Sequence, residues 1–137
     1  MERFEENSYS GAKLNFYRNL PKSAPKAIVH ISHGMAEYAG RYEWFMQTLM
    51  EAGYAVYAHD IRGHGYTYAS DSFKGHFSDK HGLDKILHDL DFSIHLIKKN
   101  HPDIPIFCFG HSLGSILLLR YATSMYHRIN GIACWNS

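Results

Sequence analysis

The sequence has 137 residues, of which 45% are hydrophobic, so the chain can bury one compact core. Its 14 basic and 13 acidic residues give a net charge of +1 and are spread along the chain, which argues against binding to nucleic acid or anionic lipid. The first ten residues are polar and acidic, unlike a signal peptide, and the longest aliphatic run covers only residues 116–119. We therefore expect a soluble, cytoplasmic protein with no transmembrane segment.

Cysteine and histidine usage argues against a disulfide framework and against a metal site. Cys108 and Cys134 each lie in an apolar segment, which favours reduced thiols in the core. Eleven histidines raise the question of metal binding, and the closest cluster is His59, Asp60 and His64. Neither HExxH nor paired CxxC spacing accompanies that cluster, so we expect no metal and no cofactor.

The first third of the chain predicts a hairpin and then a buried strand. Residues 13–18 alternate in polarity and are expected to pair with the segment before Gly11. A Pro-rich loop over residues 19–26 follows. Residues 27–32 are almost continuously apolar, which is typical of a strand covered on both faces.

Strands and helices then alternate to the end of the sequence. Apolar residues recur at helical spacing over 42–52, 83–100 and 112–125, and Gly53 and His101-Pro102 end the first two of these segments. Strands are predicted at 54–59, 104–109 and 131–135, with a long loop over 66–81. This alternation predicts an α/β fold in which the strands at 27–32, 54–59, 104–109 and 131–135 lie parallel in one doubly wound sheet.

A GxSxG sequence, Gly110 to Gly114, joins the strand at 104–109 directly to the helix at 112–125. The bare motif is weakly specific, but this is the setting that a nucleophile elbow requires. A tight turn strains the serine dihedrals and leaves no room for side chains at Gly110 and Gly114. Because GxGxxG and the P-loop pattern are absent, a nucleotide-binding turn is the weaker interpretation. The motif predicts Ser112 as a nucleophile with its hydroxyl near the N-terminus of the following helix.

An acyl-transfer serine also needs backbone N–H groups to bind an oxyanion. Leu113 is expected to supply one, because it directly follows Ser112 at the start of the helix. The second donor is expected from the loop after the strand at 27–32, where His33-Gly34-Met35 stands. Gly34 allows close backbone approach, so the Met35 amide is the predicted donor and His33 and Gly34 are expected to shape the site. The alternative is that His33-Gly34 only turns the chain.

Three blocks together resemble monoglyceride lipases and bacterial lysophospholipases, which are also grouped as serine-aminopeptidase-like α/β-hydrolases. The blocks are HGMAEYAGRY (33–42), AHDIRGHG (58–65) and FGHSLGS (109–115), in family order and at family-like spacing. The resemblance covers nearly the whole chain and implies Ser112 as nucleophile and the Met35 and Leu113 amides as oxyanion hole. It extends only through the sixth strand, so the chain resembles the N-terminal part of a single domain over residues 1–137, without the last strands and the cap.

Within these blocks the remaining polar residues are expected to support the site. The resemblance marks AHDIRGHG as a turn after a strand, so Asp60, Arg62 and His64 are expected to brace loops. His111 adjoins the nucleophile, but its side chain should point away from Ser112, which favours packing or hydrogen bonding over a role as base. Glu37 and Arg41 match family positions, and the sequence assigns neither a chemical role.

The partners that a serine nucleophile needs are missing after Ser112. A free hydroxyl is a weak nucleophile, so a histidine and an acid must follow in the order Ser, Asp or Glu, His. Only His127 follows, with no Asp or Glu. A helical rise of ~1.5 Å per residue places His127 roughly 20 Å from Ser112, too far to act as the base.

The sequence therefore predicts a serine carboxylic-ester hydrolase scaffold whose triad Asp and His are absent from these 137 residues. The expected substrates are monoacylglycerols, lysophospholipids or other small esters. Two alternatives remain open: peptidase or acyltransferase chemistry on the same fold, or a catalytically inactive, truncated interaction module. An unpaired edge at 131–135 further predicts self-association or pairing with a missing C-terminal half.

Overall fold

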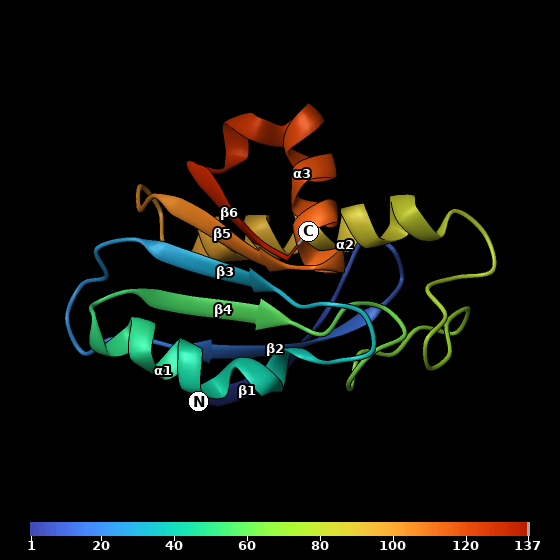
Figure 1. Cartoon of the computed structure of the whole chain (residues 1–137), viewed down its shortest axis with the longest axis horizontal. Coiled ribbons are helices and arrows are strands. Elements are labelled where there is room, and N and C mark those ends of the chain that lie inside the picture. Colours follow the sequence, from blue (N-terminus) through green and yellow to red (C-terminus); the bar gives the residue numbers. More distant parts are fainter. Residues whose placement is uncertain (137) are drawn as a thin grey trace.

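A computed structural model describes residues 1–136, which form one six-stranded sheet with helices on both faces (Figure 1). The strands are β1 (Glu2–Asn7), β2 (Lys13–Asn19), β3 (Ile28–Ser32), β4 (Ala55–His59), β5 (Ile106–His111) and β6 (Gly131–Trp135). The helices are α1 (Glu43–Glu51), α2 (Gly82–Asn100) and α3 (Leu113–Met125), with 3₁₀ turns η1 (Ala39–Tyr42) and η2 (Tyr126–Arg128). Within residues 1–136, no helix is long and apolar enough to cross a membrane.

The strand order is β1-β2-β4-β3-β5-β6. β1 pairs with β2, and β2 with β4, in antiparallel fashion, whereas β4, β3, β5 and β6 are mutually parallel. Both the hairpin and the four parallel strands predicted from the sequence are confirmed. Gly11, with φ of +85°, occupies the hairpin turn between β1 and β2, a conformation that glycine adopts without steric cost.

The boundaries of the fifth strand differ from the prediction in a way that matters for the site. The apolar pattern predicts residues 104–109, but β5 covers Ile106–His111. Pro105 precedes the strand and has no N–H to donate to a ladder. At the other end, pairing with β6 continues until His111 lies opposite Trp135. The strand therefore runs directly into Ser112, and α3 begins at Leu113 instead of at residue 112.

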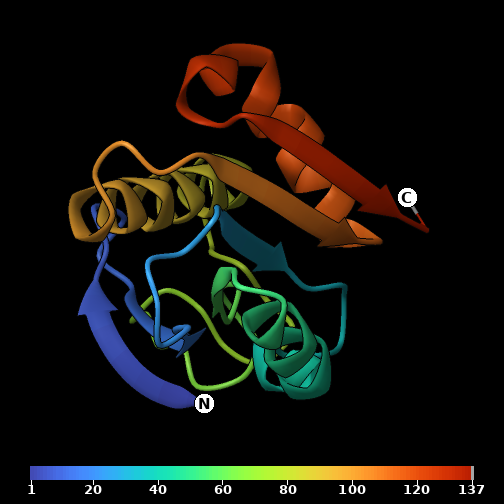
Figure 2. The ribbon, with the colours of Figure 1, turned by 90° about the vertical axis from the view of Figure 1, so that its left-hand side faces the viewer.

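The core consists of two layers separated by the sheet (Figure 2). On one face, α2 and α3 pack on the inner strands, with Ile94 of α2 and Leu118 of α3 fully buried. On the opposite face, α1 inserts Met46 against Ile31 and Val56. Alternating residues of the inner strands thus meet helices on both sides, as the near-continuous apolar pattern predicts.

The outer strand β6 is not covered in the same way. Cys134 is exposed, so its prediction as a core thiol is wrong, whereas Cys108 on β5 is buried as expected. The reason is position: β6 is the last strand of the sheet, and Trp135 beside Cys134 is 65% exposed. Ile116 and Leu119 on α3 are also exposed. An apolar surface therefore lies along this edge.

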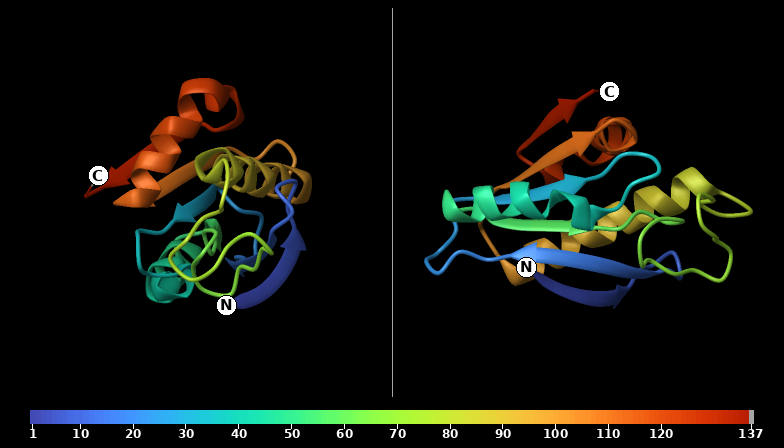
Figure 3. Two further views of the ribbon diagram at one scale, coloured as in Figure 1. Left: turned by 90° about the vertical axis from the view of Figure 1, so that its right-hand side faces the viewer. Right: turned by 60° about the horizontal axis from the view of Figure 1, so that its bottom comes forward.

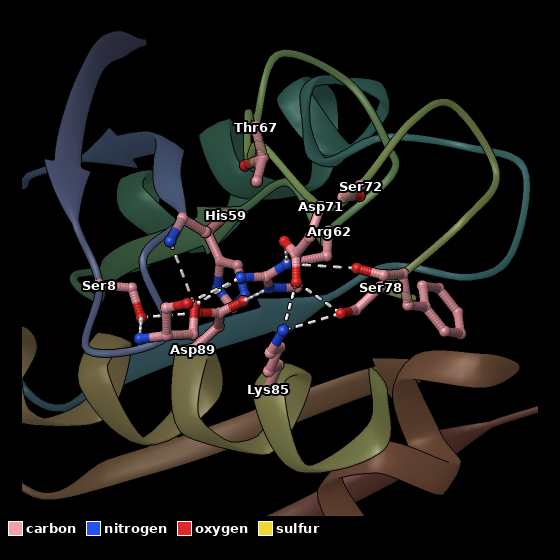
Figure 4. Close-up of polar contacts among 12 residues, drawn as sticks. Ser8, His59, Arg62, Thr67, Asp71, Ser72, Ser78, Lys85 and Asp89 are labelled. Atoms are coloured by element: carbon pink, nitrogen blue, oxygen red, sulfur yellow. Dashed lines mark hydrogen bonds and ion pairs between the residues drawn. The ribbon is translucent and has the colours of Figure 1, made fainter. Parts of the chain in front are cut away.

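A buried arginine fastens the connection between β4 and α2 to the body of the protein (Figure 4). Arg62 is 1% exposed, and its Nε lies 3.0 Å from Oδ2 of Asp89 on α2. Its Nη1 lies 2.9 Å from Asp71 of the same connection, and its Nη2 bonds the carbonyl of Ser10. Figures 1 and 3 show this connection extending beyond the carboxyl ends of β3 and β4. The ion pairs thereby hold a long loop beside the strand ends.

Two histidines are enclosed in the layer beneath α2. Nε2 of His30 on β3 lies 3.2 Å from Nδ1 of His59 on β4, and the same His59 nitrogen is 3.1 Å from Oγ of Ser93. Burial lowers the pKa of His30 from 6.5 to about 4, and burial also lowers the pKa of His59. Both imidazoles are therefore neutral in the folded protein near pH 7.

We predict that this burial makes the protein acid-sensitive. Below pH 6.5, His30 binds a proton in the unfolded chain but stays neutral in the folded protein. The free energy of unfolding therefore falls as the pH drops from about 6.5 to about 4. The expected loss from His30 is about 3 kcal/mol. Urea unfolding at several pH values should show a shallower decline for His30→Leu, whereas exposed His127→Leu should match the wild type. An unchanged slope in His30→Leu would contradict the assignment.

Candidate active site

The turn between β5 and α3 has the strained geometry of a nucleophile elbow. Ser112 adopts φ of 51° and ψ of −115°, a backbone conformation that residues with a side chain rarely occupy. Its N–H donates to the carbonyl of Trp135 at 2.9 Å, and its carbonyl accepts from Ile116. The turn is thereby fastened both to the neighbouring strand and to the first turn of α3.

The glycines on either side of Ser112 are required by packing. A Cβ on Gly110 would lie 2.6 Å from the backbone nitrogen of Ser115, and a Cβ on Gly114 would lie 2.0 Å from the carbonyl oxygen of Ser32. Both separations are shorter than real Cβ contacts. The collision that the sequence motif predicts for larger residues is thus confirmed. The absence of a side chain at Gly114 lets α3 pack directly against the end of β3.

The loop after β3 lies beside the elbow. Ser32 and Gly110 are register partners on adjacent parallel strands, so residues 33–37 and Ser112 leave the same edge of the sheet. The Gly34 N–H donates to Oε1 of Glu37 at 2.5 Å, and the Ala36 N–H donates to Nε2 of His64 at 3.2 Å. Between them, the Met35 N–H has no acceptor among residues 1–136. The loop therefore leaves the Met35 amide available.

His33 fixes the direction of that amide. Its buried Nε2 accepts the Ile61 N–H at 2.9 Å, so Nδ1 carries the proton and donates to the Gly34 carbonyl at 2.7 Å. Burial lowers the pKa of His33, which keeps the ring neutral. In a trans peptide the carbonyl and the following N–H point in opposite directions. The His33 bond therefore orients the Met35 N–H away from the buried His33 ring.

The AHDIRGHG block braces the surrounding loops, as expected from the sequence. Asp60 is fully buried, and its two carboxylate oxygens accept the backbone N–H groups of Ala39 and Tyr66 at 2.8 and 2.9 Å. Nδ1 of His64 lies 3.0 Å from the carbonyl of Arg62 while Nε2 holds Ala36. Both nitrogens of His64 are thus engaged in loop contacts.

Glu37 and His111 form a contact that the sequence analysis did not foresee. Oε1 of Glu37 lies 3.0 Å from Nδ1 of His111, across 74 residues of sequence. His111 is therefore a hydrogen-bonding residue, as its position beside Ser112 suggested. In the sequence, the only sign of a role for Glu37 is that Glu37 and Arg41 match family positions. The local sequence around Glu37 does not indicate that its partner is His111.

An open cavity of about 560 Å³ lies between the 33–37 loop and the β4–α2 connection. It is lined by residues 35–38, 63–65, 74 and 75. The cavity thus borders Met35, and its lining includes both His64 and Lys74.

The residues that follow Ser112 offer no histidine beside it and no acid. His127 lies in η2, beyond the far end of α3, and no Asp or Glu follows Ser112. Among the earlier histidines, His33 and His64 are held by loop contacts and His111 by Glu37. The structure thus brings together an elbow and a candidate oxyanion loop.

We predict that Gly114→Ala disrupts the elbow. The added methyl cannot coexist with the Ser32 carbonyl, so β3 and α3 must separate, at a cost of roughly 1–3 kcal/mol or more. A matched control is Gly82→Ala at the start of α2, where the nearest heavy atom to the new Cβ is 3.3 Å away on the Phe77 side chain. Urea denaturation should show destabilisation of the first variant only, and equal midpoints would refute the packing argument.

Comparison with known proteins agrees with this geometry. The family model described as serine aminopeptidase, S33, matches residues 23–137. Monoglyceride lipase of Rattus norvegicus is 30% identical over 112 residues, covering 82% of this chain and 35% of that protein. Monoacylglycerol lipase of Mycolicibacterium smegmatis is 35% identical over 119 residues, covering 85% of this chain and 40% of that protein.

A solved esterase structure has a fold similar to that of this chain. The thermostable carboxyl esterase of Bacillus coagulans superposes with a TM-score of 0.84 at 29% identity, covering 97% of this chain and 43% of the esterase. The chain thus spans between about a third and somewhat over two fifths of the length of these relatives. Its mostly parallel sheet is an incomplete α/β-hydrolase fold. The chain therefore belongs to the serine aminopeptidase S33 family of hydrolases.

Proposed function

We propose that this chain carries the nucleophile and oxyanion hole of a serine carboxylic-ester hydrolase. The observation that carries the proposal is the positive φ of Ser112 between two glycines that no other residue could replace. Strain at such a position persists only where the surrounding structure imposes it, and it is typical of functional sites. The names of the relatives, lipases and an esterase, support ester chemistry.

In the proposed reaction, Oγ of Ser112 attacks the ester carbonyl carbon while its proton passes to a base. The carbonyl oxygen becomes an oxyanion, which the Met35 and Leu113 N–H groups bind. Collapse of this intermediate releases the alcohol and leaves an acyl-serine, and water then releases the acid. The base and its orienting acid are expected from a His-Asp pair outside these 137 residues.

The geometry supports these two donors in particular. Leu113 opens α3, where the first N–H groups of a helix have no partner within the helix and the helix dipole favours negative charge. The Met35 amide has no acceptor among residues 1–136, and the His33 bond to the Gly34 carbonyl orients it. We expect both nitrogens to lie ~3 Å from a bound oxyanion.

The proposed substrates are monoacylglycerols, lysophospholipids or other small esters. A monoglyceride lipase and a monoacylglycerol lipase are among the relatives, and Phospholipase YtpA of Bacillus subtilis is 31% identical over 109 residues. The family description as serine aminopeptidase makes amide cleavage the natural second candidate. Once a His-Asp pair is supplied, a p-nitrophenyl ester tested beside a p-nitroanilide of the same acyl group would separate the two.

We predict that Ser112 of the 137-residue chain reacts with an alkyl fluorophosphonate, although the chain does not catalyse ester hydrolysis. A p-nitrophenyl ester should not be hydrolysed measurably above the Ser112→Ala background, because removing triad members costs several orders of magnitude in rate. An alkyl fluorophosphonate should nevertheless label Ser112 slowly, and faster as the pH rises, because hydroxide can replace the missing base. Intact-mass spectrometry and peptide mapping would locate the label.

The control is Ser124→Ala, which removes an exposed serine from the other end of the same helix and should leave labelling unchanged. Label spread over several serines, or equal labelling of Ser112→Ala, would contradict the assignment of the nucleophile. Ester hydrolysis that depends on Ser112 would show instead that a histidine in this chain acts as the base.

We further propose that the uncovered edge makes the isolated chain associate with copies of itself. Trp135 on β6 is 65% exposed and Phe107 on β5 is 42% exposed. Trp135 also lines an open hollow of about 580 Å³ together with Trp44 and Phe45 of α1. An unpaired apolar strand edge is a template for pairing.

Light scattering after size exclusion at micromolar concentration should therefore give a mass above 15.8 kDa. Trp135→Lys should shift the chain toward the monomer, whereas Leu20→Lys, which alters an exposed loop residue, should not. A stable wild-type monomer with little binding of a hydrophobic dye would contradict the proposal.

A further inference from the structure

One carboxylate oxygen joins three separate parts of the site. Oε1 of Glu37 lies 2.5 Å from the Gly34 nitrogen, 2.7 Å from the Tyr42 hydroxyl and 3.0 Å from Nδ1 of His111. The other oxygen faces the surface, 3.3 Å from Nη1 of Arg41. The oxyanion loop, the turn before α1 and the residue that precedes the nucleophile are thereby tied to a single atom.

The charge of Glu37 decides where the His111 proton lies. Burial alone would raise the pKa of Glu37, but hydrogen bonds from His111, Gly34 and Tyr42 outweigh it and hold that pKa below its usual value. An ionised carboxylate only accepts hydrogen bonds, so Nδ1 of His111 must be the donor. Neutral His111 is therefore the Nδ1–H tautomer, and its Nε2 is free to accept.

The packing around Gly34 independently points to the same contact. Gly34 does not have a positive φ, so its backbone conformation does not require glycine. A Cβ there would lie 2.9 Å from Nδ1 of His111 and 3.0 Å from Oε1 of Glu37. The missing side chain is what lets Glu37 and His111 close over the loop.

We propose that Glu37 is a positioning residue that locks the 33–37 loop to the elbow and thereby sets the distance between the Met35 amide and Ser112. Glu37 holds the Gly34 N–H while His33 holds the Gly34 carbonyl, so both sides of this residue are fixed. His111 shares the same oxygen and is bonded directly to Ser112 in the chain. A shift of the loop therefore has to move the elbow as well.

For its effect on reaction rate, this inference rests on the proposed function of Ser112, whereas the contact and the tautomer can be tested without any reaction. The variants are Glu37→Leu, which removes the acceptor, and Glu37→Gln, whose amide oxygen can still accept from Gly34. The matched control is Glu43→Gln, which neutralises an exposed carboxylate at the start of α1. Far-UV circular dichroism establishes that each variant is folded.

The first readout is the rate at which an alkyl fluorophosphonate modifies Ser112. Deleting an oxyanion donor outright costs about 10²–10³, so a displaced donor should slow labelling about 100-fold in Glu37→Leu and about 10-fold in Glu37→Gln. Glu43→Gln should react at the wild-type rate. This graded rescue separates positioning from general stability, because both Glu37 variants are compared only where they are folded.

The second readout is the tautomer of His111, observed by long-range ¹H–¹⁵N NMR and assigned with His111→Gln. The wild type and Glu37→Gln should show the proton on Nδ1, and Glu37→Leu should show a shift toward Nε2–H. Wild-type labelling rates in folded Glu37→Leu, or in Glu37→Gln if the leucine variant does not fold, would overturn the proposal. A wild-type Nε2–H tautomer would also overturn it. If wild-type Ser112 does not react at all, the proposed function fails and the tautomer alone decides the contact.

Discussion

A serine held at a positive φ between a strand and a helix is the constraint on which the rest of this site depends. The turn is possible only because β5 continues in register with β3 and β6 as far as residues 110 and 111, so that the chain reverses at the very edge of the sheet. Gly114 then packs against the end of β3 with no space for a methyl group. The strain at Ser112 is thus imposed by close packing of three elements that are distant in sequence.

The loop opposite the elbow is organised by a different kind of interaction, namely hydrogen bonds from buried polar side chains. His33, Glu37 and His64 each hold one backbone group of residues 34–36. Unpaired polar groups would be costly at this depth, so each bond restricts the loop to one arrangement. The Met35 amide, which has no acceptor among residues 1–136, is one that the proposed chemistry needs. In this arrangement, His33 and His64 hold backbone groups of the loop that lies beside the elbow.

Local sequence patterns were sufficient for the fold because the periodicity of apolar residues is strong in each segment. The four parallel strands and three helices lie where predicted, with shifts of one or two residues at their ends. The shift of β5 arose because strand pairing continues through Gly110 and His111, which are not apolar, so no hydrophobic pattern marks the true end. Ser112 and the glycines around it could be found from the GxSxG motif, because the tight turn excludes side chains at Gly110 and Gly114.

The contacts that complete the site could not be predicted in the same way. Glu37 and His111 are 74 residues apart, and Arg62 and Asp89 are 27 apart, so neither pair leaves a periodic or local signature. Cys134 was misplaced for a related reason: its apolar neighbours predict burial, but burial also requires a covering element, and β6 is the edge of the sheet. Contacts between polar side chains that are distant in the sequence can therefore be identified only from the structure.

In the proposed reaction, Ser112 Oγ attacks the carbon of one substrate carbonyl group while the Met35 and Leu113 amides bind the oxygen of that same group. A crystal structure of the protein phosphonylated by an alkyl fluorophosphonate tests this most directly, because the adduct places an oxygen where the oxyanion of the reaction would lie. We expect phosphorus bonded to Oγ of Ser112 and a phosphoryl oxygen ~3 Å from both amide nitrogens. An adduct on another side chain, or a phosphoryl oxygen bound by neither amide, would contradict it.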